Sequence, residues 1–192
     1  MKEREEPFRY SGIRPLTAKR VLSEEVGDEV DSNYEKKVEE LCLREGITLR
    51  RVQNDMANFQ LNLQFPNPQS NINVVQPKGK DDMIIIGAII EIAETHRKSL
   101  QALEAKKREE FIWNLRLTLA KGNVEFELKH PDNILEFVRV HKFLFEDGFS
   151  KNAFMNALFD VNRSKLLVIW FIQKEFGASP SRPPAEEASM YR

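Results

Sequence analysis

The chain has 192 residues, of which 41% are hydrophobic and 31% are charged, and its formal net charge is −1. This balance is typical of one globular domain, and it excludes a protein that gathers nucleic acid or anionic lipid through a strong overall charge. The single cysteine, Cys42, has no partner for an internal disulfide or a zinc site. We therefore expect one hydrophobic core and no chemistry that needs paired thiols.

The hydrophobic segments are short. The longest apolar run, residues 83–90, is far below the roughly 20 residues that a membrane-spanning helix requires. The first six residues are mostly charged and lack the apolar centre of a signal peptide. These features predict a cytoplasmic protein with no membrane partner.

Both ends of the chain differ in composition from its middle. Residues 1–32 mix charged residues and prolines with scattered apolar ones and show neither a helical nor a strand period. Residues 178–192 hold three prolines among small and charged residues. We predict a disordered arm at 1–32, one domain at 33–177 and a disordered tail at 178–192. Whether the arm orders on binding a partner is left open by its composition.

The first part of the domain predicts one helix followed by strands. Apolar residues at helical spacing predict a helix over 33–45 that stops at Gly46. Residues 59–65 then alternate between apolar and polar, which predicts a strand of an antiparallel sheet with one buried and one wet face. Shorter apolar stretches predict further strands at 47–52 and 72–75.

The middle of the domain returns to helix and then to strand. Residues 83–92 are continuously apolar and rich in β-branched side chains, which predicts a central strand. A helical period over 96–121 predicts one long helix. Alternation returns at 124–129, and a turn leads to another strand-like block at 134–145.

The last element of the domain is predicted to be a helix. Ser150 is well placed as its N-cap, and Phe149 and Phe154 occupy the two positions of a hydrophobic staple. A break at 162–164 would make residues 166–172 a buried strand instead. We prefer one continuous helix because no glycine or proline interrupts this part of the chain.

The element order defines the expected fold class. The predicted order is α-β-β-β(-β)-α-β-β-α. Runs of strands separated by single helices are typical of α+β proteins. We therefore predict an α+β fold with a single antiparallel sheet of about five to six strands packed with helices.

Residues 166–172 are apolar on every side of the predicted last helix. A helix without a wet face packs against its own sheet on one side and against something else on the other. One sheet layer in a domain of this size does not readily cover such a helix completely. We therefore predict that Leu167, Trp170 and Phe171 lie at a surface where two copies associate as a homodimer. Complete burial within one chain is the alternative.

One pattern suggests metal-dependent nuclease chemistry. Glu127 and Lys129 share a face of a predicted strand, and Asp81 and Asp82 lie in an earlier turn. In many nucleases, carboxylates hold Mg²⁺ and a nearby lysine helps to position the attacking water. However, Glu125 lies on the same face, so the wet side of an amphipathic strand explains the pattern better.

Other chemical signals are weaker. The three histidines, His96, His130 and His141, have no metal-ligand spacing, and no glycine-rich loop opens a helix to hold phosphate. The helix predicted at 96–121 is locally basic, but aromatic residues do not alternate with its charges as they do in many nucleic-acid sites. We therefore expect no catalytic residue, metal ion or cofactor, and no nucleic-acid partner.

Several motifs resemble those of a known protein family. They are MIIIG at 83–87 with ETH at 94–96, FLFEDGFSK at 143–151 with Phe154, and LVIW at 167–170. In these motifs the chain is similar to a family of uncharacterised archaeal proteins related in architecture to YbjN-like proteins and to type III secretion chaperones. The resemblance covers about residues 33–177 and is carried mainly by core and capping residues.

The resemblance implies a function as well as a fold. It implies a compact α+β domain, commonly a homodimer, without known enzymatic activity. Secretion chaperones bind an extended protein segment along apolar surface and sheet edges. We therefore expect a non-enzymatic interaction module that acts as a chaperone or adaptor and binds a peptide or protein segment. The alternative is a nucleic-acid-binding protein or a Mg²⁺-dependent nuclease that uses Asp82, Glu127 and Lys129.

Overall fold

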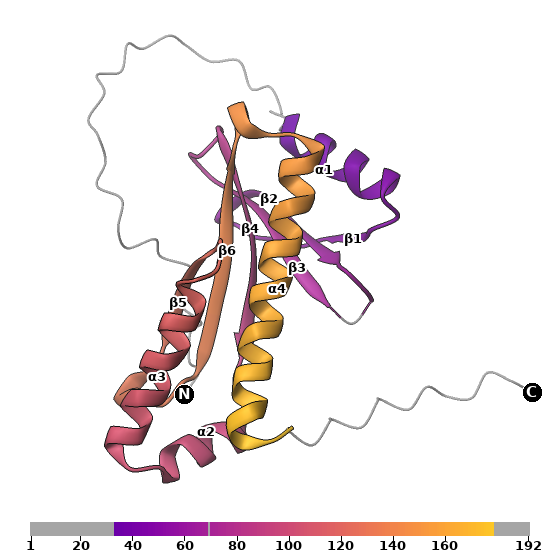
Figure 1. Cartoon of the computed structure of the whole chain (residues 1–192). Coiled ribbons are helices and arrows are strands. Elements are labelled where there is room, and N and C mark those ends of the chain that lie inside the picture. Colours follow the sequence, from indigo (N-terminus) through magenta and orange to yellow (C-terminus); the bar gives the residue numbers. More distant parts are fainter. Residues whose placement is uncertain (1–32, 69, 179–192) are drawn as a thin grey trace, which may run out of the picture.

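A six-stranded antiparallel sheet forms the centre of the computed structural model, which describes residues 33–68 and 70–178. The predicted arm and all but the first residue of the predicted tail lie outside the described residues. The strand order across the sheet is β1-β2-β3-β4-β6-β5 (Figure 1). The strands are β1 (Thr48–Arg51), β2 (Ala57–Gln64), β3 (Asn71–Pro77), β4 (Met83–Glu91), β5 (Glu125–Lys129) and β6 (Phe137–Phe145). The predicted α+β class with a single antiparallel sheet is thus confirmed.

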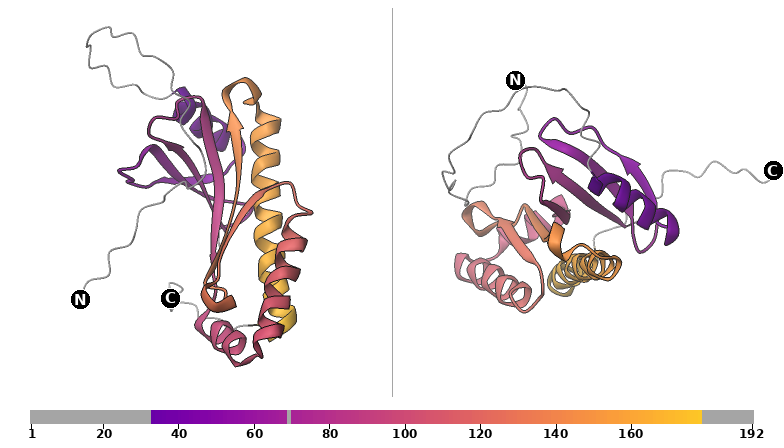
Figure 2. Two further views of the ribbon diagram at one scale, coloured as in Figure 1. Left: turned by 90° about the vertical axis from the view of Figure 1, so that its left-hand side faces the viewer. Right: turned by 90° about the horizontal axis from the view of Figure 1, so that it is seen from above.

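The helices lie together on one face of this sheet (Figure 2, right). They are α1 (Asn33–Arg44), α2 (Glu94–Ala102), α3 (Ala105–Leu119) and α4 (Lys151–Phe176), with short 3₁₀ turns at Pro131–Asn133 and Glu146–Gly148. The longest helix, α4, runs along β4 and β6, and α3 lies beside it (Figures 1 and 2). In the described part of the chain, none of these helices is long and apolar enough to cross a membrane.

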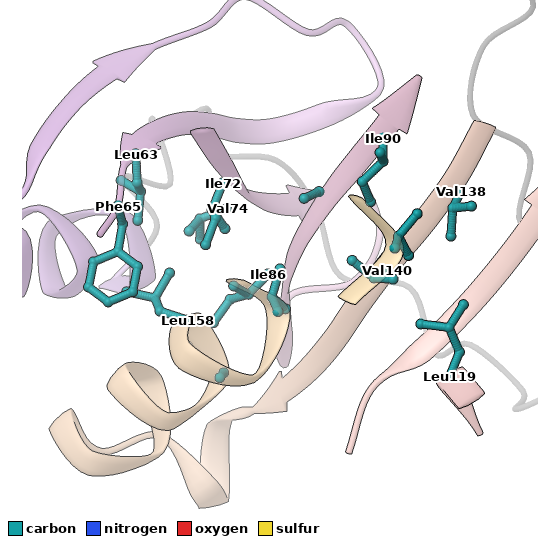
Figure 3. Packing of buried hydrophobic residues seen from close by; sticks show 14 of the residues in the cluster. Leu63, Phe65, Ile72, Val74, Ile86, Ile90, Leu119, Val138, Val140 and Leu158 are labelled. Atoms are coloured by element: carbon teal, nitrogen blue, oxygen red, sulfur yellow. The ribbon is translucent and has the colours of Figure 1, made fainter. Parts of the chain in front are cut away.

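The core fills the space between the sheet and the helices. Strand β2 shows how the sequence builds it, since Phe59, Leu61 and Leu63 are buried while the residues between them are more exposed. Apolar residues of β3, β4 and β6 join them, and α4 contributes fully buried side chains such as Leu158 (Figure 3). Burial of this apolar surface is the main force that holds the helices to one side of the sheet.

The long helix predicted at 96–121 is two helices, so that prediction was wrong. The chain is extended at Leu103 (φ −72°, ψ 153°) and at Glu104, between α2 and α3. The Arg108 guanidinium donates hydrogen bonds to the carbonyl oxygens of Leu103 (2.6 Å) and Gln101 (3.3 Å). These bonds satisfy backbone acceptors that the break leaves without helical partners. The sequence has no glycine or proline at the break. A side chain from the next helix, Arg108, stabilises it instead.

The final helix is continuous, as predicted, and its start is capped. Ser150 has an extended backbone, and its hydroxyl accepts a hydrogen bond from the Ala153 amide at 3.1 Å. The rings of Phe149 and Phe154 lie 6.2 Å apart, in agreement with the predicted hydrophobic staple. The helix ends before Gly177, which has a positive φ of 79°.

The cap gives a first testable prediction. Ser150→Ala removes the acceptor for the Ala153 amide, and we expect it to lower the free energy of unfolding by about 1 kcal/mol in urea denaturation. Ser99→Ala is the matched control, because the Ser99 hydroxyl lies exposed on α2 and only donates to a carbonyl of its own helix. A Ser150→Ala loss no larger than that of the control would contradict the capping role.

Candidate functional site

One face of the sheet is covered by no helix of the described residues (Figure 2). On β4, the side chains of Ile84, Ile86, Ala88 and Ile90 belong to the core beneath the helices. Because side chains of a strand alternate between its two sides, the remaining residues of β4 point the opposite way. The antiparallel register sets them beside alternate residues of β6. We call this side of the sheet the open face.

The middle of the open face is apolar. We define its apolar strip as Val75 of β3, Met83, Ile85 and Ile89 of β4, and Phe137, Phe143 and Phe145 of β6. The register sets Met83 opposite Phe145, and Ile85 opposite Phe143. Ile89 and Phe145, toward the two ends of the strip, are 50% and 49% exposed. Met83 and Ile85 are only 8% and 6% exposed, and Arg139 lies opposite Ile89, so the apolar strip presents water-exposed apolar groups mainly at its two ends.

A glycine lies in the middle of the strip. Gly87 pairs with His141 of β6, and a Cβ atom on Gly87 would stand 3.0 Å from both the His141 Cβ and the Val140 carbonyl oxygen. The missing side chain therefore allows the close approach of β4 and β6 at this pair. The His141 ring contacts Phe143 edge-on at 5.0 Å between ring centroids. Burial, and then the charge of Arg139, lower the pKa of His141, against the opposing effect of Glu125. A neutral imidazole suits an apolar surface.

Polar amide side chains flank the strip on the β2 side. The open-face residues of β2 and of the first half of β3 are asparagine or glutamine, namely Asn58, Gln60, Asn62, Gln64, Asn71 and Asn73. The amides of Gln60 and Asn62 both donate to the Asn73 side-chain oxygen, at 3.4 and 3.2 Å. Such uncharged donors and acceptors can bind polar groups of a polypeptide laid beside the strip.

Charged side chains flank the strip on the β5 side. Glu127 pairs with Arg139 of the neighbouring strand, and Lys129 pairs with Glu136 at 3.0 Å. Glu125 lies opposite His141. Both signs of charge are thus present along this edge.

An open hollow of about 470 Å³ lies at the end of the strip where β4 begins and β6 ends. Its lining includes Phe145 and three acidic residues, Asp82, Glu146 and Asp147. Close by, burial, and then Glu146, raise the pKa of Tyr34 to about 12, so its hydroxyl stays protonated and donates to the Asp82 carbonyl oxygen at 3.2 Å. This end of the strip is therefore acidic.

The predicted self-association residues lie on α4 but do not face the same way. Trp170 is 62% exposed, and Phe159 lies on the same outer side of the helix at 47% exposure. Leu167 and Phe171 are partly buried and pack against the core, and the Phe171 ring lies 5.2 Å from that of Phe111 on α3. The neighbouring helix α3 thus covers more of α4 than we expected, and Trp170 is the most exposed of the three.

The residues of the nuclease pattern are not brought together. Asp82 precedes Met83, which pairs with Phe145, whereas Glu127 pairs with Arg139. These two positions of β6 are six residues apart in sequence, a distance of roughly 20 Å along a strand. Among the described residues, no group of three or more histidine, cysteine, aspartate or glutamate side chains can hold a metal ion.

The remaining reactive side chains have structural partners. The His96 ring nitrogen lies 3.2 Å from the Gly177 carbonyl oxygen, and the His130 ring contacts the Arg116 guanidinium at 2.6 Å. Cys42 is fully buried, and burial raises the pKa of its thiol to about 11. The thiolate, which is the reactive form, is therefore scarce at neutral pH.

Sequence reasoning missed the apolar strip, although the sequence contains a signal for it. Strand β6 has apolar residues on both of its sides, since Val138, Val140 and Leu144 alternate with Phe137, Phe143 and Phe145. We predicted a central strand from the continuous apolar run at 83–92 and another strand at 134–145, but not which of their faces the helices leave uncovered. The structure shows that the helices cover only one of these sides.

Comparisons with known proteins place the chain in a family. Residues 34–172 match the model of a family described as Uncharacterized conserved protein (DUF2299). The crystal structure of an uncharacterized protein from Methanothermobacter thermautotrophicus is 37% identical, with a TM-score of 0.71, and the match covers 74% of this chain and 99% of that one. YbjN from E. coli is 14% identical, with a TM-score of 0.41, over 69% of this chain and 89% of that one. A comparison with curated proteins gave no match.

Two of these findings confirm a prediction. The family match and the relative from Methanothermobacter thermautotrophicus agree with the resemblance to uncharacterised archaeal proteins that the core and capping motifs indicate. YbjN also appears among the matches, but at this TM-score it supports no statement on function.

Proposed function

The chain belongs to the DUF2299 family of uncharacterized conserved proteins, and we propose that it is a non-enzymatic interaction module that binds an apolar segment of another polypeptide on its open face. The observation that carries this proposal is the apolar strip on β4 and β6, which no helix of the described residues covers. We propose in addition that two copies associate through the outer side of α4.

The size of the apolar strip supports a binding role. The nine residues of β4 span roughly 30 Å, and two strands side by side give a surface of roughly 300 Å². This footprint lies at the lower end of the roughly 300–600 Å² that the largest apolar patch on an ordinary monomeric protein covers, and such patches often bind partners. Scattered exposed apolar residues carry no such meaning. In the strip, Val75, Ile85 and Phe143 are direct neighbours in the strand register, and so are Met83 and Phe145.

The shape of the strip favours an extended segment as its ligand. It is long and narrow, with amides on one side and charged side chains on the other. A segment lying along β4 and β6 would place its apolar side chains on the strip and its polar groups against the Asn and Gln residues of β2 and β3. In proteins that bind an extended peptide at a sheet edge, pockets for its alternate side chains provide specificity, and the groups beside the strip can do so on a sheet face.

The proposal is tested with an unfolded polypeptide. The full chain is titrated into the fluorescein-labelled B chain of insulin, which is rich in apolar residues, and anisotropy is recorded at two salt concentrations. We expect saturable binding that depends little on salt, because burial of apolar surface drives it. The proposal would be contradicted if the full chain bound single-stranded RNA tightly, with an affinity that falls steeply as salt rises, and did not bind the B chain.

The proposed self-association gives a separate prediction. Trp170→Glu places a charge on the outer side of α4, and burying an unpaired charge in an interface is costly. By light-scattering chromatography, we expect the wild type at twice the chain mass of 22.4 kDa and Trp170→Glu at 22.4 kDa. The matched control is Trp113→Glu on α3, where the tryptophan is 52% exposed. A wild type that is monomeric at 22.4 kDa, or equal dissociation of both variants, would contradict an interface on α4.

A further inference from the structure

The N-terminal arm joins the domain beside one end of the apolar strip. Helix α1 begins at Asn33, and the hydroxyl of the next residue, Tyr34, donates to the Asp82 carbonyl oxygen at 3.2 Å. Asp82 immediately precedes Met83 of the strip, and it lines the same hollow as Phe145. Residues 1–32 are therefore attached within a few residues of the surface that the helices leave uncovered.

The sequence of the arm divides into two parts of opposite charge. Residues 8–22, FRYSGIRPLTAKRVL, contain four basic and no acidic residues together with Phe8, Tyr10, Ile13, Leu16, Val21 and Leu22. Residues 23–32, SEEVGDEVDS, contain five acidic and no basic residues. The arm thus holds one segment that is both apolar and basic, separated from the domain by an acidic linker.

The charges around the strip complement this segment. Asp82, Glu146 and Asp147 lie at the near end of the strip, and Glu91 lies at the far end of β4. Glu125, Glu127 and Lys129 line the β5 side, where Glu127 pairs with Arg139 of β6 and Lys129 with Glu136. Acidic groups therefore predominate at the near end of the strip, whereas at its far end Lys129 and Arg139 lie over the Phe137 ring beside Glu91. The acidic near end favours a basic apolar segment over an acidic one.

The lengths also fit. Ten extended linker residues span up to roughly 33 Å, which is enough to bring residues 8–22 to any point along the roughly 30 Å strip. The strip area of roughly 300 Å² is well below the roughly 800 Å² per partner of a standard interface between two proteins. A linear segment therefore suits this surface better than a second copy of the domain.

We propose that residues 8–22 dock on the apolar strip of their own chain. There the arm covers the apolar groups of the strip. It also competes with any segment of another protein that binds the strip, and this competition rests on the proposed function. The tether holds the arm at an effective concentration near the millimolar range, so even weak intrinsic binding keeps the strip largely occupied.

The location of the arm is tested by cross-linking in the full chain. A benzophenone amino acid replaces Ile13, and an equal mixture of ¹⁴N- and ¹⁵N-labelled protein is irradiated and analysed by mass spectrometry. We expect cross-links to peptides that contain residues 83–91 or 137–145, within chains of one isotope. Cross-links that fall only on the helices, or that join the two isotopes, would overturn docking of the arm on its own chain.

Competition is tested with variants of the arm. Ile13→Glu with Leu16→Glu removes two apolar side chains from the docking segment, and we expect B-chain binding to tighten about tenfold. Ser11→Glu with Thr17→Glu is the matched control, which adds the same charge and keeps the apolar side chains, and we expect a change below about threefold. Equal effects of the two pairs would overturn competition by the arm.

The two experiments separate this inference from the proposed function. Cross-links on the strip, with no B-chain binding by the wild type or by the Ile13→Glu, Leu16→Glu variant, would support docking of the arm and contradict the proposed function. B-chain binding on the open face without cross-links from the arm to the strip would support the proposed function and contradict docking of the arm.

Discussion

Phe154→Ala lowers the free energy of unfolding by about 3–5 kcal/mol, the range for truncation of a fully buried phenylalanine. Phe154 is completely buried in the first turns of α4, and its ring packs against that of Phe149 at 6.2 Å between centroids. Its loss leaves a cavity where α4, α1 and the sheet meet, because Tyr34 of α1 also contacts Phe149. Urea denaturation followed by circular dichroism measures the effect.

A second phenylalanine on the same helix is the control for this prediction. Phe159 is 47% exposed and packs edge-on against Phe65 at 5.1 Å. Phe159→Ala is expected to cost about 1 kcal/mol, since much of the side chain already contacts water. Equal losses for the two variants would show that the first turns of α4 do not anchor the helix as the structure indicates.

The sequence predicts most of the fold because its local signals agree with the tertiary packing. The alternation of apolar and polar residues in β2 and the cap at Ser150 can each be predicted from a few neighbouring residues. The break between α2 and α3 is different, because it depends on a hydrogen bond from Arg108 to the end of the preceding helix. Helix propensity in a residue window contains no such information.

The candidate site was harder to predict than the fold. An apolar residue such as Ile89 or Phe145 looks the same in sequence whether a helix covers it or water does. Which face of a strand is covered depends on where the helices pack. Conversely, residues 166–172 looked exposed on one side, but α3 packs beside them and leaves mainly Trp170 in contact with water.

Replacing two exposed members of the strip is expected to reduce partner binding strongly. Ile89→Gln with Phe145→Gln removes the two apolar groups that water reaches most, and introduces no charge. Losing burial of both in a complex corresponds to at least about tenfold weaker binding of the insulin B chain. Because both side chains are about half exposed in the free protein, the free energy of unfolding is expected to change by less than about 1 kcal/mol.

The most direct test of the central claim compares this double variant with a matched one elsewhere. Leu43→Gln with Leu117→Gln removes two side chains that are 82% and 58% exposed on α1 and α3, away from the open face. Both pairs are titrated against the labelled B chain beside the wild type. We expect weaker binding only for Ile89→Gln with Phe145→Gln. Equal affinities for the two pairs would contradict the open face as the binding site.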